Sequence, residues 1–319
     1  MGVTLILAMG FDGLIGDPKW IYNRIPHPVT WMAMLLMKGE AFLNHQDRSR
    51  FAKQFLGLIW ILLCVTICLY IAFFIQNFLS GFDQTGIILA LLSSIFLAYR
   101  SLIDHVGDVE KELFNKDVVK ARIKVAKIVG RETSKLDKSD ITRATIESLA
   151  ENFSDGVVAP VFWFLIVGFP GVVAYKMINT ADSMIGNRSE RFEDFGMASA
   201  KIDDVVNYVP ARITALLLML AAGISRVGDV KSGFVTVNND HKLHASPNAG
   251  WPEATMAGLL NVRLGGPRHY QNGNSKDNAW LGSGGDVKLK DLTRAIKLVK
   301  FSWFMMLILV LAGSILWSI

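Results

Sequence analysis

Two long runs of apolar residues constrain the fold of this chain more than any other feature. Residues 55–79 and 301–318 are almost continuous series of hydrophobic side chains, and a helix needs about 20 such residues to cross a membrane. Shorter or interrupted apolar runs cover 3–16, 86–99, 157–175 and 205–224. The hydrophobic share of 51% is too high for a typical soluble enzyme of 319 residues. We therefore expect an all-α fold, a polytopic integral membrane protein that forms a single membrane-embedded domain over 1–319.

Lysine and arginine are concentrated in a few polar segments. Residues 17–54 contain 6 of them, 100–156 and 225–300 contain 11 each, and 76–85 contain none. Cytosolic loops of membrane proteins carry such an excess of positive charge, so we expect large polar cytosolic loops. The net charge of +5 is not gathered into the basic face that a nucleic-acid-binding protein needs. The expected partner is therefore a lipid bilayer and not a nucleic acid.

A stripe of polar residues follows the helix expected from about residue 139. Arg143, Glu147 and Glu151 recur at intervals of four residues, which places them on one helical face. The stripe continues with two further polar residues, Asn152 and Asp155. Two carboxylates and an amide at a helix end suit a hard cation such as Mg²⁺. A ladder of i,i+4 ion pairs on a solvated face is the alternative interpretation.

The apolar segment 157–175 contains its own turn signals. Pro160 lies near its start, and GFPG follows at 168–171. Because Gly and Pro favour turns, the segment is either one kinked span or two half-helices that turn back. Five polar residues follow: Lys176, Asn179, Asp182, Asn187 and Arg188.

The next apolar run, 205–224, begins beside two carboxylates and contains a cation. Asp203 and Asp204 precede the run, and Arg212 lies inside it. An arginine at membrane depth needs a partner, and the two aspartates are the local candidates.

The longest polar segment, 225–300, contains HASPNAGWPEATMAG. This stretch is rich in Gly, Pro, Asn and Ser and also contains Trp251 and Glu253. A helix is expected from about Pro252, with Glu253 in the first turn, where the helix dipole favours an acid. The presence of Trp251 and Glu253 argues against a low-complexity linker. Two further elements are expected, a flexible loop at 271–285 and a basic amphipathic helix on the inner leaflet at 288–300.

Seven motifs, in this order along the chain, resemble one known family. They are GDPKW–PHPV, RSLIDHV, IVGRET–LD, RATIESLAENFSDGVVAP–FW, YKMINTADSMIGNR, DDVVNYVPARITA and SPNAGWPEATMAG–VRLGGP. Over about 10–300 the chain is similar to the membrane-bound adenosylcobinamide-phosphate synthases of cobalamin biosynthesis, the CobD/CbiB type. One position departs from the family pattern, in which a His is common after SMIG. The residue here is Asn187, which argues against proton transfer at this position.

The resemblance implies an ATP-dependent ligation in the cell inner (plasma) membrane, with the active site facing the cytosol. An amide would join a carboxyl of the corrinoid substrate, adenosylcobyric acid, to the amine of aminopropanol phosphate, giving adenosylcobinamide phosphate. ATP and Mg²⁺ are the implied cofactors, and the carboxylate would be activated most simply as an acyl phosphate. The sequence has no Walker A motif, so phosphate binding would depend on side chains and on turn or helix-end amides. Other cobalamin-pathway enzymes are candidate partners.

The same resemblance implies roles for the polar residues. The Mg²⁺ ligands would be Glu151, Asp155 and Asp182, joined by Asp203 and Asp204. Phosphate contacts would come from Arg143, Lys176, Arg188 and Arg212. Substrate would be oriented by Asn152, Asn179, Asn248 and Glu253, with Trp251 packed on the corrin. Catalytic roles would fall to Glu151 and Asp155, with His27 or His105 as the base for the amine.

Two other functions fit the composition. A transporter or permease would also carry charges in its membrane segments, but it would have little use for a large segment such as 225–300. A non-catalytic membrane partner of the same superfamily would tolerate loss of the acidic and Asn positions, all of which are present here.

The expected topology depends on two conflicting arguments. If 157–175 crosses fully, charge counts place 176–204 outside the cell. ATP is cytosolic, however, and Asp182 would then be separated from Glu151 by about 30 Å of bilayer. Re-entrant helical hairpins at 157–175 and 205–224 resolve the conflict. We therefore predict that three segments share the cytosolic side, 100–156, 176–204 and 225–300.

Overall fold

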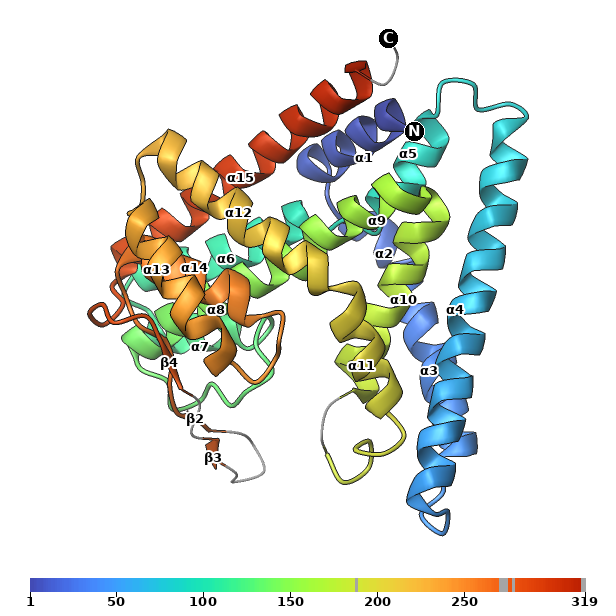
Figure 1. The fold of residues 1–319 in the computed structure, drawn as a ribbon, viewed down its shortest axis with the longest axis horizontal. Helices are drawn as coiled ribbons and strands as arrows, with labels where there is room; N and C mark the ends of the chain where they lie inside the picture. Colours follow the sequence, from blue (N-terminus) through green and yellow to red (C-terminus); the bar gives the residue numbers. More distant parts are fainter. Residues whose placement is uncertain (187–188, 270–274, 277–278, 317–319) are drawn as a thin grey trace. The chain divides into compact units, whose positions relative to one another are not determined.

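The computed structural model describes residues 1–186, 189–269, 275–276 and 279–316, which are mostly helical (Figure 1). The helices of the first half are α1 (Gly2–Leu14), α2 (Lys19–Tyr22), α3 (Pro28–Leu43), α4 (Arg50–Ser80), α5 (Ile87–Ser94), α6 (Tyr99–Phe114), α7 (Val118–Val125) and α8 (Lys138–Phe153). A π-helical turn, η1 (Ser154–Val158), leads to α9 (Ala159–Val167), α10 (Phe169–Ile185), α11 (Met197–Val206), α12 (Tyr208–Ser225), α13 (Val230–Asp240), the 3₁₀ turn η2 (His241–Leu243), α14 (Gly250–Leu260) and α15 (Leu289–Leu316). Four two-residue strands are β1 (Leu264–Gly265), β2 (Arg268–His269), β3 (Ser275–Lys276) and β4 (Trp280–Leu281).

Among the described residues, five helical segments are long and apolar enough to cross a membrane. They are Arg50–Ser80, Ile87–Phe114, Lys138–Val167, Tyr208–Ser225 and Leu289–Leu316. The all-α, polytopic fold expected from the apolar runs is therefore confirmed.

The chain divides into two compact units, each built from separate stretches of sequence. Unit 1 comprises 1–98, 159–207 and 313–319, and unit 2 comprises 99–158 and 208–312. The single domain expected from the sequence stays a prediction, and the two units are described separately below.

In unit 1, α10 packs against α4, α9 and α11, while α1 packs against α5. Small residues permit close approach of the backbones: a Cβ at Gly57 would lie 2.0 Å from the carbonyl oxygen of Phe195. An ion pair between the buried Glu40 of α3 and Arg191, with an Nη2–Oε2 distance of 2.6 Å, ties the segment after α10 to the bundle.

The apolar segment 157–175 is not one straight span. Helix α9 ends at Val167, and Gly168 adopts φ 75° and ψ −154°, a conformation essentially restricted to glycine. Helix α10 then begins at Phe169 with Pro170 in its first turn and packs back on α9. The turn expected at GFPG is therefore confirmed.

In unit 2, α8 is buried along most of its length and contacts α6, α7, α14 and β1. Its N-cap is Asp137, which forms a capping box with Asp140. The reciprocal hydrogen bonds satisfy two amides at the helix start. Strand β1 pairs with β4 so that Gly265 faces Trp280.

Three expectations for the second half of the chain are corrected. Helix α12 is uninterrupted, so the reversal that a re-entrant hairpin at 205–224 requires does not occur. Segment 288–300 is not a separate surface helix, because it is continuous with the last span in α15 and buries Leu292, Leu298 and Val299. Of the loop expected at 271–285, residues 271–274 and 277–278 lie outside the described residues, and the described part includes β4, in which Leu281 is buried.

Candidate functional site

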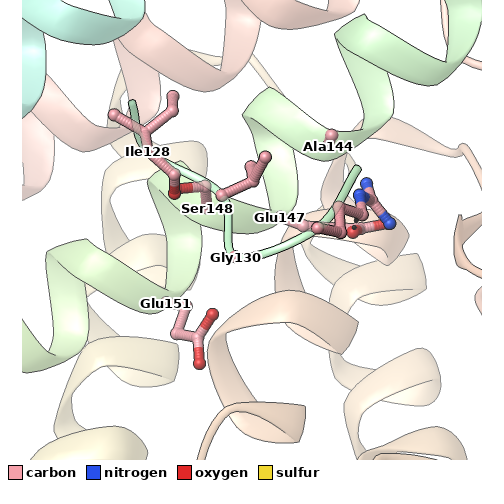
Figure 2. Close-up of a pocket in the computed structure, with 8 residues that line it drawn as sticks. Ile128, Gly130, Ala144, Glu147, Ser148 and Glu151 are labelled. Carbon is pink, nitrogen blue, oxygen red and sulfur yellow. Dashed lines mark hydrogen bonds and ion pairs between the residues drawn. The ribbon is translucent and has the colours of Figure 1, made fainter. Parts of the chain in front are cut away.

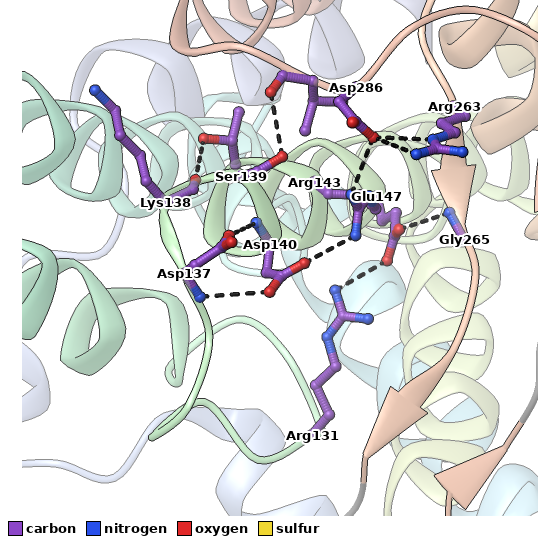
Figure 3. Close-up of polar contacts among 12 residues, drawn as sticks. Arg131, Asp137, Lys138, Ser139, Asp140, Arg143, Glu147, Arg263, Gly265 and Asp286 are labelled. Atoms are coloured by element: carbon purple, nitrogen blue, oxygen red, sulfur yellow. Dashed lines mark hydrogen bonds and ion pairs between the residues drawn. The ribbon is translucent and has the colours of Figure 1, made fainter.

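The carboxylate of Glu147 links three separate segments of unit 2 (Figure 3). Its Oε2 accepts a hydrogen bond from Arg131 Nη2 at 3.2 Å, and its Oε1 accepts one from the backbone N–H of Gly265 at 2.7 Å. The Glu147 side chain is only 5% exposed and that of Arg131 11%. A buried carboxylate must be paired and hydrogen-bonded, so Glu147 fixes the loop that carries Arg131 and the start of the β1–β4 hairpin to α8.

Arg143, one turn earlier on α8, belongs to a second charged cluster (Figure 3). Its Nη1 donates to Asp140 at 2.9 Å, and its Nη2 lies 3.9 Å from Asp286. Arg263 donates to the same Asp286 at 2.7 and 2.9 Å. Both guanidinium groups lie against the ring of Trp280, at 4.9 and 4.7 Å from its centroid. The cluster holds two cations and two carboxylates, Asp140 and Asp286, and the Arg263 hydrogen bonds lower the pKa of Asp286.

A pocket of about 190 Å³ opens beside α8 (Figure 2). Its lining residues are Ile128, Val129, Gly130, Arg131, Ala144, Glu147, Ser148 and Glu151. The Ser148 hydroxyl donates to the carbonyl oxygen of Ile128 at 2.6 Å, which anchors the covering loop. The polar stripe expected on α8 therefore lines a pocket at Glu147 and Glu151.

The end of the stripe leaves regular α-helix. Asn152 is exposed, and its amide turns back to the oxygens of Ser148. Asp155 lies in the π-helical turn η1, where the hydroxyl of Ser154 is buried without a hydrogen-bond partner among the described residues. Single π-turns inside helices occur frequently at functional sites.

Arg212, predicted inside the apolar run, has aromatic neighbours. Its guanidinium lies 3.4 Å from the ring centroid of Tyr208 and 4.6 Å from that of Trp251. Its Nη1 also lies 3.5 Å from Asn248 Oδ1, the limit for a hydrogen bond. Cation–π contacts of this kind stabilise a desolvated guanidinium. Trp251 thus contacts Arg212, and the ring of His241 as well, at 4.3 Å.

Glu253 lies in the first turn of α14, as expected, and is 1% exposed. His244 Nε2 lies 3.5 Å from its Oε1. Asn248, Trp251 and Glu253 are thus brought together around the start of α14, and Arg212 of α12 joins them.

A separate group of carboxylates lies in unit 1. Asp203 Oδ2 accepts from Asn207 Nδ2 at 2.9 Å, and Asn207 Oδ1 accepts from Tyr175 at 2.9 Å. Burial, reinforced by the charge of Asp182, raises the pKa of Asp203 to about 7. Burial and the charge of Asp204 raise the pKa of Asp182 to about 6. The negative charges of these three carboxylates therefore act on one another.

The other predicted residues of unit 1 are distributed along α10 and near α3. Asn179 favours the ionised form of Asp203, and Lys176 is half-buried one turn earlier on α10. Arg188 and Asn187 lie outside the described residues.

The two histidines proposed as bases occupy different environments. His27 is the N-cap of α3, and its Nδ1 accepts a hydrogen bond from the backbone N–H of Val29 at 3.2 Å. In a neutral imidazole only the unprotonated nitrogen can act as a base, and in His27 that nitrogen, Nδ1, already accepts this hydrogen bond. His105 is exposed on α6, where Nδ1 lies 2.7 Å from the carbonyl oxygen of Ser101, which leaves Nε2 as its basic nitrogen.

The five expected metal ligands belong to different units: Glu151 and Asp155 to unit 2, and Asp182, Asp203 and Asp204 to unit 1. In the part of the chain that the structure describes, no three His, Cys, Asp or Glu side chains form a group that could hold a metal. The metal assignment therefore stays a prediction.

Comparison with known proteins identifies the family. Residues 5–299 match the family described as CobD/Cbib protein. The chain belongs to the CobD/CbiB family. Relatives named Cobalamin biosynthesis protein CobD include one from Sinorhizobium sp, 44% identical over 270 residues that cover 84% of each chain. Another, from Rhodobacter capsulatus, is 42% identical over 316 residues, 99% of this chain and 98% of its own. A third, from Brucella anthropi, is 39% identical over 319 residues, with 98% and 97% coverage. No solved structure matches the chain.

Several polar residues of this CobD/CbiB protein were not singled out from the sequence. They are Arg131, Tyr175, Asn207, Arg263, Trp280 and Asp286. Arg131 lies in IVGRET, Tyr175 in YKMINTAD and Arg263 in VRLGGP, so the motifs contained the signal. Only the fold brings Arg131 and Gly265 to the same carboxylate.

Proposed function

We propose that this protein is an adenosylcobinamide-phosphate synthase, which joins adenosylcobyric acid to aminopropanol phosphate in an ATP-dependent amide ligation. The supporting observation is its membership of the CobD/CbiB family over residues 5–299, together with relatives that carry the name Cobalamin biosynthesis protein CobD. These names support a role in cobalamin biosynthesis, and the specific ligation is our proposal.

The reaction requires activation of a carboxylate, because a carboxylate is a poor electrophile. Transfer of the γ-phosphoryl group of ATP to the corrinoid carboxylate would give an acyl phosphate and ADP. Attack by the amine would then form the amide and expel inorganic phosphate, with one proton lost from the nitrogen. Such chemistry depends on positioning and on neutralisation of phosphoryl charge, for which the cluster of Arg143 and Arg263 is suited.

Mg²⁺ would neutralise charge on the phosphates of ATP. The residues present could supply part of a Mg²⁺ site. Asp203 Oδ1 is buried without a hydrogen-bond partner among the described residues, and burial together with the charges of Asp182 and Asp204 raises the pKa of Asp203. Mg²⁺ in phosphoryl-transfer sites is commonly held by one or two carboxylates plus substrate phosphates and water. A ready-made cluster of three protein carboxylates is therefore not required.

A direct assay tests the proposal. Full-length protein in detergent, incubated with adenosylcobyric acid, aminopropanol phosphate, ATP and Mg²⁺, should yield adenosylcobinamide phosphate, detected by mass. Turnover should stop in excess chelator and return with added Mg²⁺. Activity that persists in chelator would refute the Mg²⁺ assignment. Failure to form any amide product would refute the synthase.

A further inference from the structure

An apolar groove lies between α4 and α11 in unit 1. Its volume is about 300 Å³, and the apolar side chains that line it are Phe51, Phe55, Leu58, Met197, Ala198 and Ile202. Along α4, intervals of four and three residues place Phe51, Phe55 and Leu58 on one helical face. All three side chains are exposed, so the groove offers an open apolar surface to a ligand that is itself apolar.

The groove lies at the end of a membrane span. Helix α4 has 31 residues, which gives a length of roughly 46 Å, whereas the hydrocarbon core of a bilayer is about 30 Å thick. The continuous apolar run of α4 begins only at residue 55. The groove residues of α4, within 51–58, therefore extend from the level of the lipid headgroups into the hydrocarbon, where the molecules available to fill a groove are lipids.

The groove also contains a positive charge. Among the described residues that line it, only Lys201 is charged, and it is exposed and forms no ion pair with a described residue. The carboxylate of Asp194 lies close to the groove, but it already accepts hydrogen bonds from Arg50 Nε at 2.9 Å and from Gln54 at 3.0 Å. A ligand that complements the groove therefore combines an apolar chain with an anionic group.

We propose that this groove binds an anionic phospholipid, with one acyl chain against Phe51, Phe55 and Leu58 and the phosphate on the ammonium group of Lys201. Segment 17–54, which leads into α4, contains 6 Lys and Arg residues, as expected of a cytosolic segment. The lipid therefore comes from the cytosolic leaflet, whose anionic headgroups attract basic residues. The site goes beyond the synthase reaction and does not depend on it.

Binding of two lipids with identical chains tests the role of the charge. Native mass spectrometry on the full chain in a neutral detergent would compare dioleoyl-phosphatidylglycerol, which is anionic, with dioleoyl-phosphatidylcholine, which is zwitterionic. The wild-type protein should bind phosphatidylglycerol about fivefold more tightly, the value of one lysine near an anionic surface. Lys201→Gln should abolish this preference and leave phosphatidylcholine binding unchanged.

Lys53→Gln is the matched control. It removes the same charge at the same end of α4, but Lys53 lies two residues from both Phe51 and Phe55 and thus on the opposite side of the helix. This variant should keep the preference for phosphatidylglycerol. Equal loss in Lys53→Gln and Lys201→Gln would mean a diffuse attraction to the bilayer and would overturn the proposal.

Two further measurements locate the acyl chain. Phosphatidylglycerol with a photoreactive group in one chain should cross-link to 51–58 and 197–202, as mapped by mass spectrometry of the peptides. Leu58→Trp adds volume at an exposed position of the groove and should weaken both lipids.

Three other results contradict the proposal. Equal binding of the two lipids to the wild-type protein would remove the role of Lys201. Unchanged binding in Leu58→Trp would place the acyl chain elsewhere. Cross-links that fall outside both segments would leave the groove to a protein partner. Because no measurement here includes ATP or a corrinoid, failure of the synthase assay would leave the lipid site standing, and the reverse also holds.

Discussion

At the scale of single residues, the surroundings of each carboxylate decide what it can do. Asp203 is 8% exposed, and burial beside Asp182 raises its pKa to about 7. Asp286 is exposed, and hydrogen bonds from Arg263 lower its pKa. A carboxylate held among other negative charges is stabilised by a cation, whereas one already paired with an arginine has less to gain. Asp203 is therefore the stronger candidate for contact with Mg²⁺.

Tyr175 positions this carboxylate through Asn207. Its hydroxyl donates to Asn207 Oδ1, which directs the Asn207 amide N–H toward Asp203. Tyr175→Phe preserves the size of the ring and removes that donor. We expect turnover to fall about tenfold, as for other residues that orient a metal ligand, and the Mg²⁺ concentration for half-maximal turnover to rise.

The measurement is a Mg²⁺ titration of the synthase assay with wild-type and variant protein. A Tyr175→Phe variant that lost turnover with an unchanged Mg²⁺ requirement would place the metal elsewhere. Such a result would limit Tyr175 to a structural role in α10.

At the scale of elements, one glycine determines how two apolar helices are joined. Gly168 separates α9 from α10 with a backbone conformation that other residues rarely adopt. Gln76 of α4 accepts a hydrogen bond from the first amide of α10, at Phe169, at 3.3 Å. The turn is therefore held both by its own backbone and by a neighbouring helix.

Replacement of this glycine tests the turn. Gly168→Ala should destabilise the protein by roughly 1–3 kcal/mol, the cost of holding a side chain in such a conformation. Gly81→Ala is the matched control, because Gly81 adopts φ −72° and an added Cβ would only touch the Phe78 carbonyl oxygen at 3.6 Å. Thermal unfolding in detergent should therefore show a lower midpoint for Gly168→Ala only. Equal midpoints would show that the turn tolerates other conformations.

At the scale of the whole molecule, contacts within unit 2 restrict the topology. Glu147 accepts a hydrogen bond from Gly265 at 2.7 Å, and Arg143 lies 3.9 Å from Asp286. The polar segments that carry these residues are therefore on the same side of any membrane that the helices cross. Segment 176–204 belongs to unit 1, so its side depends on whether the 18 residues of α12 cross fully.

Because ATP is cytosolic, the proposed function predicts that 176–204 also faces the cytosol, which requires that the uninterrupted helix α12 does not cross the membrane. Cys64 and Cys68, both buried, would be replaced by alanine, and single cysteines introduced as Glu190→Cys and Ser283→Cys at exposed positions. A membrane-impermeant thiol reagent should label neither in intact cells and both in opened cells. Labelling of Glu190→Cys alone in intact cells would mean that α12 is a full span, and would place Asp182 outside the cytosol.

The sequence by itself determined the membrane class, most of the helices and the family. Apolar runs and turn residues such as those of GFPG act over a few residues, so they can be read locally. The tertiary structure decided which polar residues meet, because Glu147 and Gly265 are 118 residues apart and no local pattern links them. It also showed that α12 runs without the reversal expected at 205–224, and that 288–300 is part of α15 and not a separate surface helix. Pro210 lies in the first turn of α12, where a proline is tolerated, and the basic part of α15 is held by packing within unit 2.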